Sequence, residues 1–302
     1  MATSPTSDQL LVIIDPAARH TDGESVRIAK DVLSAGAAST RVALPEDPEE
    51  FARVLSRRGA RRPVIVGDDR ALLRAVTLLH RQRALAECVL SVVPVGASLG
   101  VAHALGVPRG VVAATRAALD GTERRLDVLI DDSDGVVLGT LRIPPVPLAP
   151  HDPDDPDPVG MVDITEGGVG LAQGGRHWLR TYQSFVRTLV PSRPSRPSRF
   201  AHVPAAPGPA RLRIEVDGVT LIDLDQPVAA VSVFPGPSGT AVVEVRPLSL
   251  GAEAAPLQAR GRTVTVSGAD FRYRADATVA GPVRHRTWTV REGALGLMLP
   301  AR

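Results

Sequence analysis

Short aliphatic runs alternate with amphipathic stretches over the first 140 residues. Leu10–Ile14, Pro63–Gly67 and Val89–Pro94 are almost continuously apolar, which is typical of strands buried on both faces of a parallel sheet. Apolar residues recur with a helical period over 22–35, 47–59 and 69–83, and shorter helices are expected over 100–105 and 111–119. This order predicts an α/β domain in which helices cover a parallel sheet.

Capping residues mark the predicted helix boundaries. Asp22 precedes the first of these helices, and Gly36 is placed to end it. Asp47 is followed by Pro48 at the first helical position and Glu50 at the third, a combination that begins a helix.

The pattern changes to a period of two after residue 210. Arg211–Val216 alternates apolar and polar residues and ends at the turn Asp217-Gly218. Further strand-like segments follow between Gly, Pro and Asp turns: Thr240–Val245, Thr263–Ser267, Phe271–Arg274, Thr287–Val290 and Leu295–Leu299. This spacing predicts an antiparallel β-sandwich.

The middle of the chain has a different character. His151–Pro158 is acidic and rich in proline, and Pro191–Arg199 repeats an Arg-Pro-Ser unit, so both are expected to be exposed. Trp178–Leu189 reads as one helix, whose aromatic face packs between domains or contacts lipid. We therefore expect an α/β domain over 1–140, a connecting segment with a crossing helix and a linker over 141–209, and a β-sandwich over 210–302.

Composition narrows the function classes. Of 302 residues, 35 are Lys or Arg and 33 are Asp or Glu, a balance that gives no reason to expect a nucleic-acid partner. Lys30 is the one lysine, so no P-loop lysine exists, and Cys88 as the one cysteine excludes an internal disulfide or a cysteine-based zinc site. No signal peptide and no apolar run of membrane-spanning length are found, which predicts a cytoplasmic protein.

Two strand–turn–helix units carry the candidate chemistry. The first turn reads Gly-Asp-Asp-Arg-Ala over 67–71, and the second reads Gly-Ala-Ser-Leu-Gly over 96–100. Parallel strands present their ligand sites at their carboxyl ends, so we expect both turns to open on the same edge. Helix N-termini and backbone N–H groups meeting there would form a phosphate-binding site.

These units, followed by a predicted β-sandwich, resemble the catalytic domain of the diacylglycerol kinase family of bacterial lipid kinases, which is related to the sphingosine and NAD kinases. The family turns read Gly-Gly-Asp-Gly-Thr and Gly-Thr-Gly-Asn-Asp. Other segments look similar and occur in the same order: Ile14–Pro16, Ala117–Asp127, Trp178–Leu189, Arg262–Val266, Tyr273–Asp276 and Glu292–Pro300.

The resemblance implies an ATP-dependent kinase of diacylglycerol or a related lipid alcohol that uses Mg²⁺. Candidate nucleotide-binding residues are Gly67, Asp69, Arg70, Gly96 and Ser98. By the same resemblance, Asp276 is the candidate catalytic base toward the lipid hydroxyl. A lipid or membrane surface is the expected partner, with peripheral membrane association, and a second copy of the chain is a candidate partner as well. No metal-ligating residue is assigned.

The turns also depart from the family pattern. Asp68, Arg70 and Ala71 replace Gly, Gly and Thr, so an added negative charge and two side chains stand where a phosphate would lie. Ala277 and Thr278 follow Asp276 in place of Gly-Glu. We therefore expect a catalytically impaired, pseudokinase-like protein that binds nucleotide, lipid or a partner in its interdomain cleft; the alternative is an active lipid kinase.

Several candidate residues have a plain structural alternative. Asp69 is either a Mg–ATP residue or the N-cap of its own helix, and Asp276 is either a base or an exposed turn residue. His103 is either a phosphate contact or a surface histidine. The aspartates at 131, 132 and 134 are either a metal cluster or, as their sequence favours, a hairpin turn.

Overall fold

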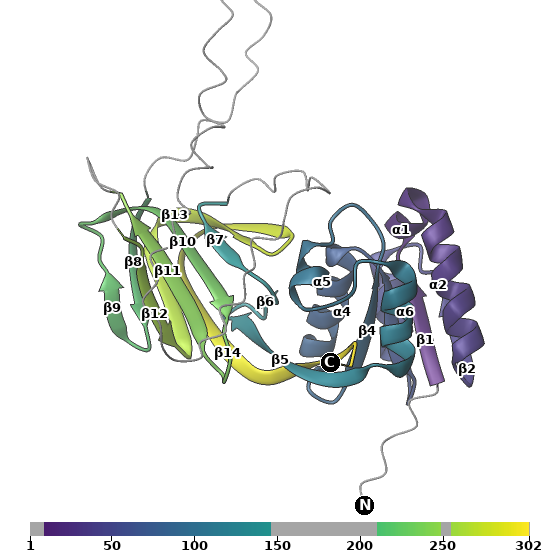
Figure 1. Cartoon of the computed structure of the whole chain (residues 1–302). Coiled ribbons are helices and arrows are strands. Elements are labelled where there is room, and N and C mark those ends of the chain that lie inside the picture. The colour runs from purple at the N-terminus through teal and green to yellow at the C-terminus, as the bar shows by residue number, and fades with distance from the viewer. Residues whose placement is uncertain (1–8, 146–209, 249–254, 302) are drawn as a thin grey trace, which may run out of the picture. The chain divides into compact units, whose positions relative to one another are not determined.

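The structure, a computed structural model, describes residues 9–145, 210–248 and 255–301. The described part combines helices with many antiparallel strands, so the predicted mixed α/β class is confirmed (Figure 1). The predicted helix Trp178–Leu189, the acidic segment His151–Pro158 and the Arg-Pro-Ser repeat lie outside these residues. The predicted domain boundaries stay predictions.

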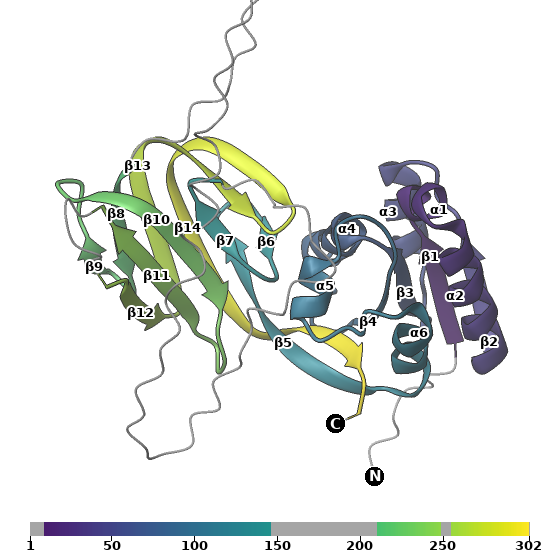
Figure 2. The same ribbon diagram turned by 45° about the horizontal axis from the view of Figure 1, so that its top comes forward.

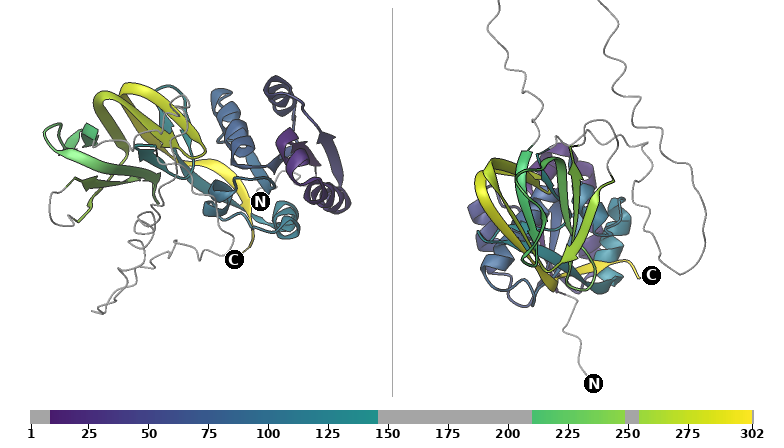
Figure 3. Two further views of the ribbon diagram at one scale, coloured as in Figure 1. Left: turned by 90° about the horizontal axis from the view of Figure 1, so that it is seen from above. Right: turned by 90° about the vertical axis from the view of Figure 1, so that its left-hand side faces the viewer.

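Strands and helices alternate in the first part of the chain. The elements are β1 (Gln9–Ile14), α1 (Pro16–Thr21), α2 (Gly23–Gly36), β2 (Ser39–Ala43), α3 (Pro48–Ser56), β3 (Arg62–Gly67), α4 (Asp69–Arg81), β4 (Val89–Pro94), α5 (Gly100–Ala104) and α6 (Val111–Asp120). The strands are ordered β4-β3-β1-β2, and each neighbouring pair is parallel. Helix α2 contacts α6 on one face of these strands and α3 contacts α4 on the other (Figure 3).

The capping residues act as their positions predict. The Asp22 carboxylate accepts from the Ser25 N–H at the start of α2, and the Asp47 carboxylate accepts from the Glu50 N–H at the start of α3. Strand β2 was not predicted, because it is mostly exposed and carries no apolar run. None of the helices in the described ranges is long and apolar enough to span a bilayer.

Antiparallel strands make up most of the remainder. They are β5 (Thr122–Asp131), β6 (Val136–Val137), β7 (Leu141–Ile143), β8 (Ala210–Val216), β9 (Val219–Ile222), β10 (Pro227–Pro235), β11 (Ala241–Pro247), β12 (Leu257–Gly261), β13 (Thr263–Ala275) and β14 (Thr278–Leu299). Their central order is β12-β11-β10-β7-β13-β14, while β8 pairs with β9, β10 and β13.

Strand β14 joins the two strand systems. It is one strand of 22 residues, where the sequence predicts two shorter ones. Its first part pairs with β13, and its last part pairs with β5 and in parallel with β4 (Figure 2). Trp288 and Val290 belong to the core of the antiparallel strands, whereas Leu295 and Leu297 belong to the core of the α/β elements. A single strand thus contributes to both hydrophobic cores.

Candidate functional site

The first turn follows β3 and is tightly packed. A Cβ added at Gly67 would come within 2.7 Å of the Ala71 Cβ and 3.0 Å of the Asp15 Cβ, so only glycine fits there without a shift. The Asp68 carboxylate accepts from the backbone N–H groups of Arg70 at 3.0 Å and Ala71 at 3.1 Å. Asp68, and not Asp69, is therefore the N-cap of α4.

The second turn follows β4 and is hydrogen-bonded to the first. The Val95 N–H donates to the Gly67 carbonyl at 3.0 Å, and the Asp69 N–H donates to the Ser98 carbonyl at 2.8 Å. Gly96 has a φ of +136°, and a Cβ there would lie 2.9 Å from the Asp68 Cβ. The structure thus brings together Gly67, Asp69, Gly96 and Ser98, whereas the Arg70 side chain is exposed.

The Asp69 carboxylate is buried and fully engaged with the second turn. One oxygen accepts from the Ala102 N–H at 3.0 Å, and the other accepts from the Val101 N–H at 3.0 Å and the Ser98 hydroxyl at 3.2 Å. Burial raises the pKa of Asp69 above its ordinary value, although the two amides oppose the shift. The prediction that Asp69 caps its own helix is therefore wrong. Its carboxylate binds the Val101 and Ala102 N–H groups in the first turn of α5 instead.

A third aspartate stands at the same edge. Asp15 follows β1, is 5 % exposed, and accepts from the Ala17 N–H at 2.9 Å as the N-cap of α1. Its other oxygen is paired with the Arg74 guanidinium at 2.8 Å. We call Asp15, Asp68 and Asp69 the acidic edge, since they follow neighbouring strands and place three carboxylates at their carboxyl ends.

Asp276 holds the turn between β6 and β7. Its carboxylate accepts from three successive backbone N–H groups, those of Leu138 at 2.7 Å and of Gly139 and Thr140 at 2.8 Å each. The side chain is 8 % exposed, so the expectation of an exposed turn residue is wrong. Its φ of +49° is a conformation that aspartate tolerates better than most residues.

Burial raises the pKa of Asp276, with the three amides opposing and the negative charge of Asp69 adding to the shift. A raised pKa suits a base, yet geometry comes before pKa in judging a catalytic group. Three of roughly four acceptor positions on this carboxylate are taken by backbone N–H groups. The residue is therefore placed to fix the turn at 138–140 and poorly placed to receive a proton from a ligand.

The donor set does not fit a bound Mg²⁺. This ion needs carboxylate oxygens that are available for octahedral coordination, and the oxygens of Asp69 and Asp276 already accept backbone N–H groups. Across the described ranges, no group of three or more His, Cys, Asp or Glu side chains is arranged to hold a metal ion.

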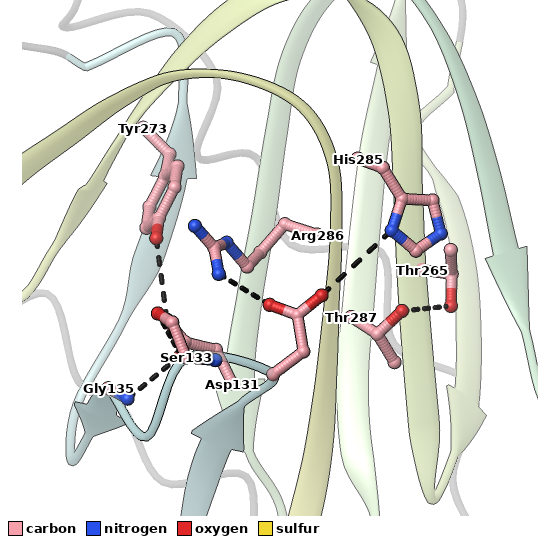
Figure 4. A network of polar contacts seen from close by, with 9 residues as sticks. Asp131, Ser133, Gly135, Thr265, Tyr273, His285, Arg286 and Thr287 are labelled. Carbon is pink, nitrogen blue, oxygen red and sulfur yellow. Dashed lines mark hydrogen bonds and ion pairs between the residues drawn. The ribbon is translucent and has the colours of Figure 1, made fainter.

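Figure 4 shows the polar contacts around the end of β5, where Asp131 is the last residue of the strand. One Asp131 oxygen accepts from the N–H groups of Ser133 and Gly135 at 2.8 Å each, and the other faces the Tyr273 hydroxyl at 3.4 Å. Burial raises the pKa of Asp131, but hydrogen bonds from the Ser133 hydroxyl and from the N–H groups of Gly135 and Ser133 outweigh it and hold the pKa below its ordinary value. The segment is a turn between β5 and β6, as its sequence favours.

The two other aspartates of this turn, Asp132 and Asp134, contact residues of other elements. The Asp132 carboxylate is paired with the Arg286 guanidinium of β14 and lies 3.9 Å from the His285 imidazole. Asp134 lies 3.4 Å from His80 of α4. His103 lies in the last turn of α5 and is half-buried, whereas a surface histidine was one of its two predicted roles.

Asp127 is a structural residue that the sequence did not reveal. Its two oxygens accept from the N–H groups of Gly239 and Gly293, at 2.7 Å each. These partners are 112 and 166 residues away along the chain, so no local pattern announces the contact.

Comparisons with known proteins place this architecture. No protein-family model matches the chain, and no curated protein matches it. A solved structure from Bacillus anthracis str. Sterne, described as a “putative diacylglycerol kinase”, is 13% identical, with 98% of this chain and 99% of that chain covered and a TM-score of 0.63. A second structure from that organism, described as a diacylglycerol kinase, is 12% identical, with 97% of each chain covered and a TM-score of 0.63. The chain therefore has the fold of these Bacillus anthracis proteins over nearly its full length.

Proposed function

We propose that this chain is a diacylglycerol-kinase-like protein that does not transfer phosphate efficiently and acts by binding. The proposal rests above all on the Asp69 carboxylate, which accepts from the N–H groups of Val101 and Ala102. In a phosphate-binding turn these amides would face the ligand. Here a side chain of the protein supplies the negative charge, so the second turn is satisfied without a nucleotide.

Electrostatics support the same conclusion. The acidic edge carries three carboxylates, and Arg74 compensates Asp15 alone by a direct ion pair. Two like unit charges about 5 Å apart repel by about 3 kcal/mol at an effective dielectric constant of about 20. A triphosphate entering beside Asp68 meets this repulsion, which weakens ATP binding and disfavours the Mg²⁺-dependent reaction that the resemblance implies.

Asp276 supports the proposal independently. An efficient base has to reach the hydroxyl proton of its substrate, within about 3 Å. This carboxylate is buried and holds three amides. In the proposed function the α/β elements form a nucleotide-site scaffold, the antiparallel strands form a sandwich that faces lipid or a protein partner, and the protein associates peripherally with membranes.

The test is transfer of labelled phosphate from ATP to diacylglycerol in mixed micelles by the full-length chain. The wild type is compared with Asp276→Asn and with Asp68→Asn, which keeps a good N-cap but removes one charge from the acidic edge. We expect turnover far below 1 s⁻¹, about the lower range of kinases, in every form. Wild-type turnover at or above that rate, abolished by Asp276→Asn, overturns the proposal and identifies an active lipid kinase.

A further inference from the structure

A cavity of about 410 Å³ is lined mainly by residues of the strands β7, β10 and β11. Its volume falls within the range of small-molecule sites, about 300–1,000 Å³. The polar and aromatic side chains that matter to its chemistry are Thr140, Arg142, Ser232, Phe234, Glu244 and Arg246. Neither the acidic edge nor the Asp276 carboxylate contributes to its lining.

The strand register explains why these side chains converge. Ser232 of β10 is opposite Arg142 on β7 and opposite Glu244 on β11, so the three form a row across the sheet. Arg246 follows two residues after Glu244 and therefore points to the same face, as does Phe234 relative to Ser232. The face thus presents two guanidinium groups and a hydroxyl beside an aromatic ring.

The charges in this row are incompletely balanced. No hydrogen bond or ion pair joins the Arg142 guanidinium to another side chain of the described ranges, and the carboxylate that lines the same cavity, that of Glu244, is paired with Arg246 at 3.4 Å. The side chain of Arg246 is 65% exposed, so that pair contributes little.

We infer that this cavity is a binding site for a phosphate group, which Arg142 and Arg246 bind together with the Ser232 hydroxyl. Guanidinium groups suit this ligand because their planar N–H donors match the oxygens of a phosphate in pairs. The Phe234 ring provides an apolar surface for the carbon portion of the ligand. A phosphate ester, either soluble or in the headgroup of an anionic phospholipid, has this combination of features.

Glu244 gives the inference a directional test. Its carboxylate lies in the same cavity and repels a phosphate, so Glu244→Gln removes repulsion while Arg142→Gln removes attraction. Arg260→Gln is the matched control, because Arg260 is an exposed arginine on the neighbouring strand β12 that does not line the cavity. Nonspecific attraction to anions would be reduced similarly by both arginine substitutions.

The experiment titrates glycerol 3-phosphate into the full-length chain by calorimetry, and separately measures sedimentation of the chain with vesicles of phosphatidylcholine alone or with phosphatidic acid. Saturable binding in either arm is expected to weaken about tenfold or more in Arg142→Gln, as for the loss of a charge-assisted hydrogen bond. It is expected to tighten severalfold in Glu244→Gln and to change less than twofold in Arg260→Gln. Circular dichroism of each variant verifies that the fold is retained.

Binding in the calorimetric arm assigns the site to a soluble phosphate ester, and binding only to vesicles with phosphatidic acid assigns it to a lipid headgroup. Either result supports the inference when Arg142→Gln and Glu244→Gln shift affinity in opposite directions. Absence of binding in both arms overturns it, and so do equal losses in Arg142→Gln and Arg260→Gln. Neither outcome depends on whether the acidic edge binds ATP.

Discussion

Replacing Asp69 by asparagine tests whether this carboxylate secures the second turn. One oxygen of the native side chain accepts from Ala102, and the other accepts from Val101 and Ser98. The carboxamide keeps one acceptor and turns an NH₂ group toward the remaining donors. One buried N–H is then left without an acceptor, which costs about 1–3 kcal/mol.

We expect Asp69→Asn to lower the free energy of unfolding at pH 7 by about 2 kcal/mol, after part of the loss is offset by removing a buried charge. The corresponding fall in Tm is about 4–8 °C. Asp22→Asn is the matched control, because Asp22 caps α2 in full contact with solvent, and asparagine is as good an N-cap as aspartate. It should change stability by less than about 0.5 kcal/mol.

Urea denaturation measures the difference, and amide hydrogen exchange locates it. The amides of Val101 and Ala102 should exchange faster in Asp69→Asn, while those of α2 should not. If Asp69→Asn is as stable as Asp22→Asn and these two amides exchange at the wild-type rate, the carboxylate does not hold the turn and the reasoning fails.

Three further predictions follow from the same contacts. Asp276→Asn should lower the free energy of unfolding by about 2 kcal/mol and speed hydrogen exchange of the amides at 138–140. Asp270→Asn, at an exposed ion pair, should change it by less than about 0.5 kcal/mol. Equal effects of the two substitutions would contradict the role of Asp276 in holding this turn. Gly96→Ala should cost about 1–3 kcal/mol because of its φ of +136°. Gly23→Ala, at the start of α2 with open space around it, should cost less than about 0.5 kcal/mol in the same denaturation assay. Burial raises the pKa of Asp69 and of Asp276 in the folded state. The stability that these two groups contribute is therefore fully present below the unfolded pKa of about 4 and is lost as the pH rises through the raised values. Lowering the pH from about 7 to about 5 should stabilise the wild type more than the variant that carries both Asp69→Asn and Asp276→Asn.

The local elements were predictable because their signals are local. The buried strands β1, β3 and β4 are continuous aliphatic runs, and Asp22 and Asp47 begin helices by binding N–H groups three residues ahead. The proximity of the turns after β3 and β4 was also predictable, because the carboxyl ends of parallel strands lie at the same edge of a sheet. Strand β2 escaped prediction because it is mostly exposed, and β14 was divided because its middle residues lack a regular alternation.

The roles of the site aspartates were not predictable for a different reason. Asp69 binds groups 32 and 33 residues away, and Asp276 binds groups 136 to 138 residues away. A sequence shows that an aspartate follows a strand or a turn, but the identity of its donors depends on how distant segments meet. The same holds for Asp127, whose partners are Gly239 in the loop between β10 and β11 and Gly293 within β14.

The proposed function also makes a direct statement about ATP. The acidic edge repels phosphate, and Asp69 already binds the amides of the second turn. The nucleotide site at this edge should therefore have lost most of its affinity for ATP. Losing two charge-assisted contacts of about 1.5–3 kcal/mol each weakens a micromolar site by at least about a hundredfold.

Calorimetric titration of the full-length chain with ATP, with and without Mg²⁺, measures this affinity. The account predicts a Kd in the millimolar range or no detectable binding under both conditions. A micromolar Kd that requires Mg²⁺ would contradict it, because the nucleotide and its metal would then bind despite the three carboxylates at this edge.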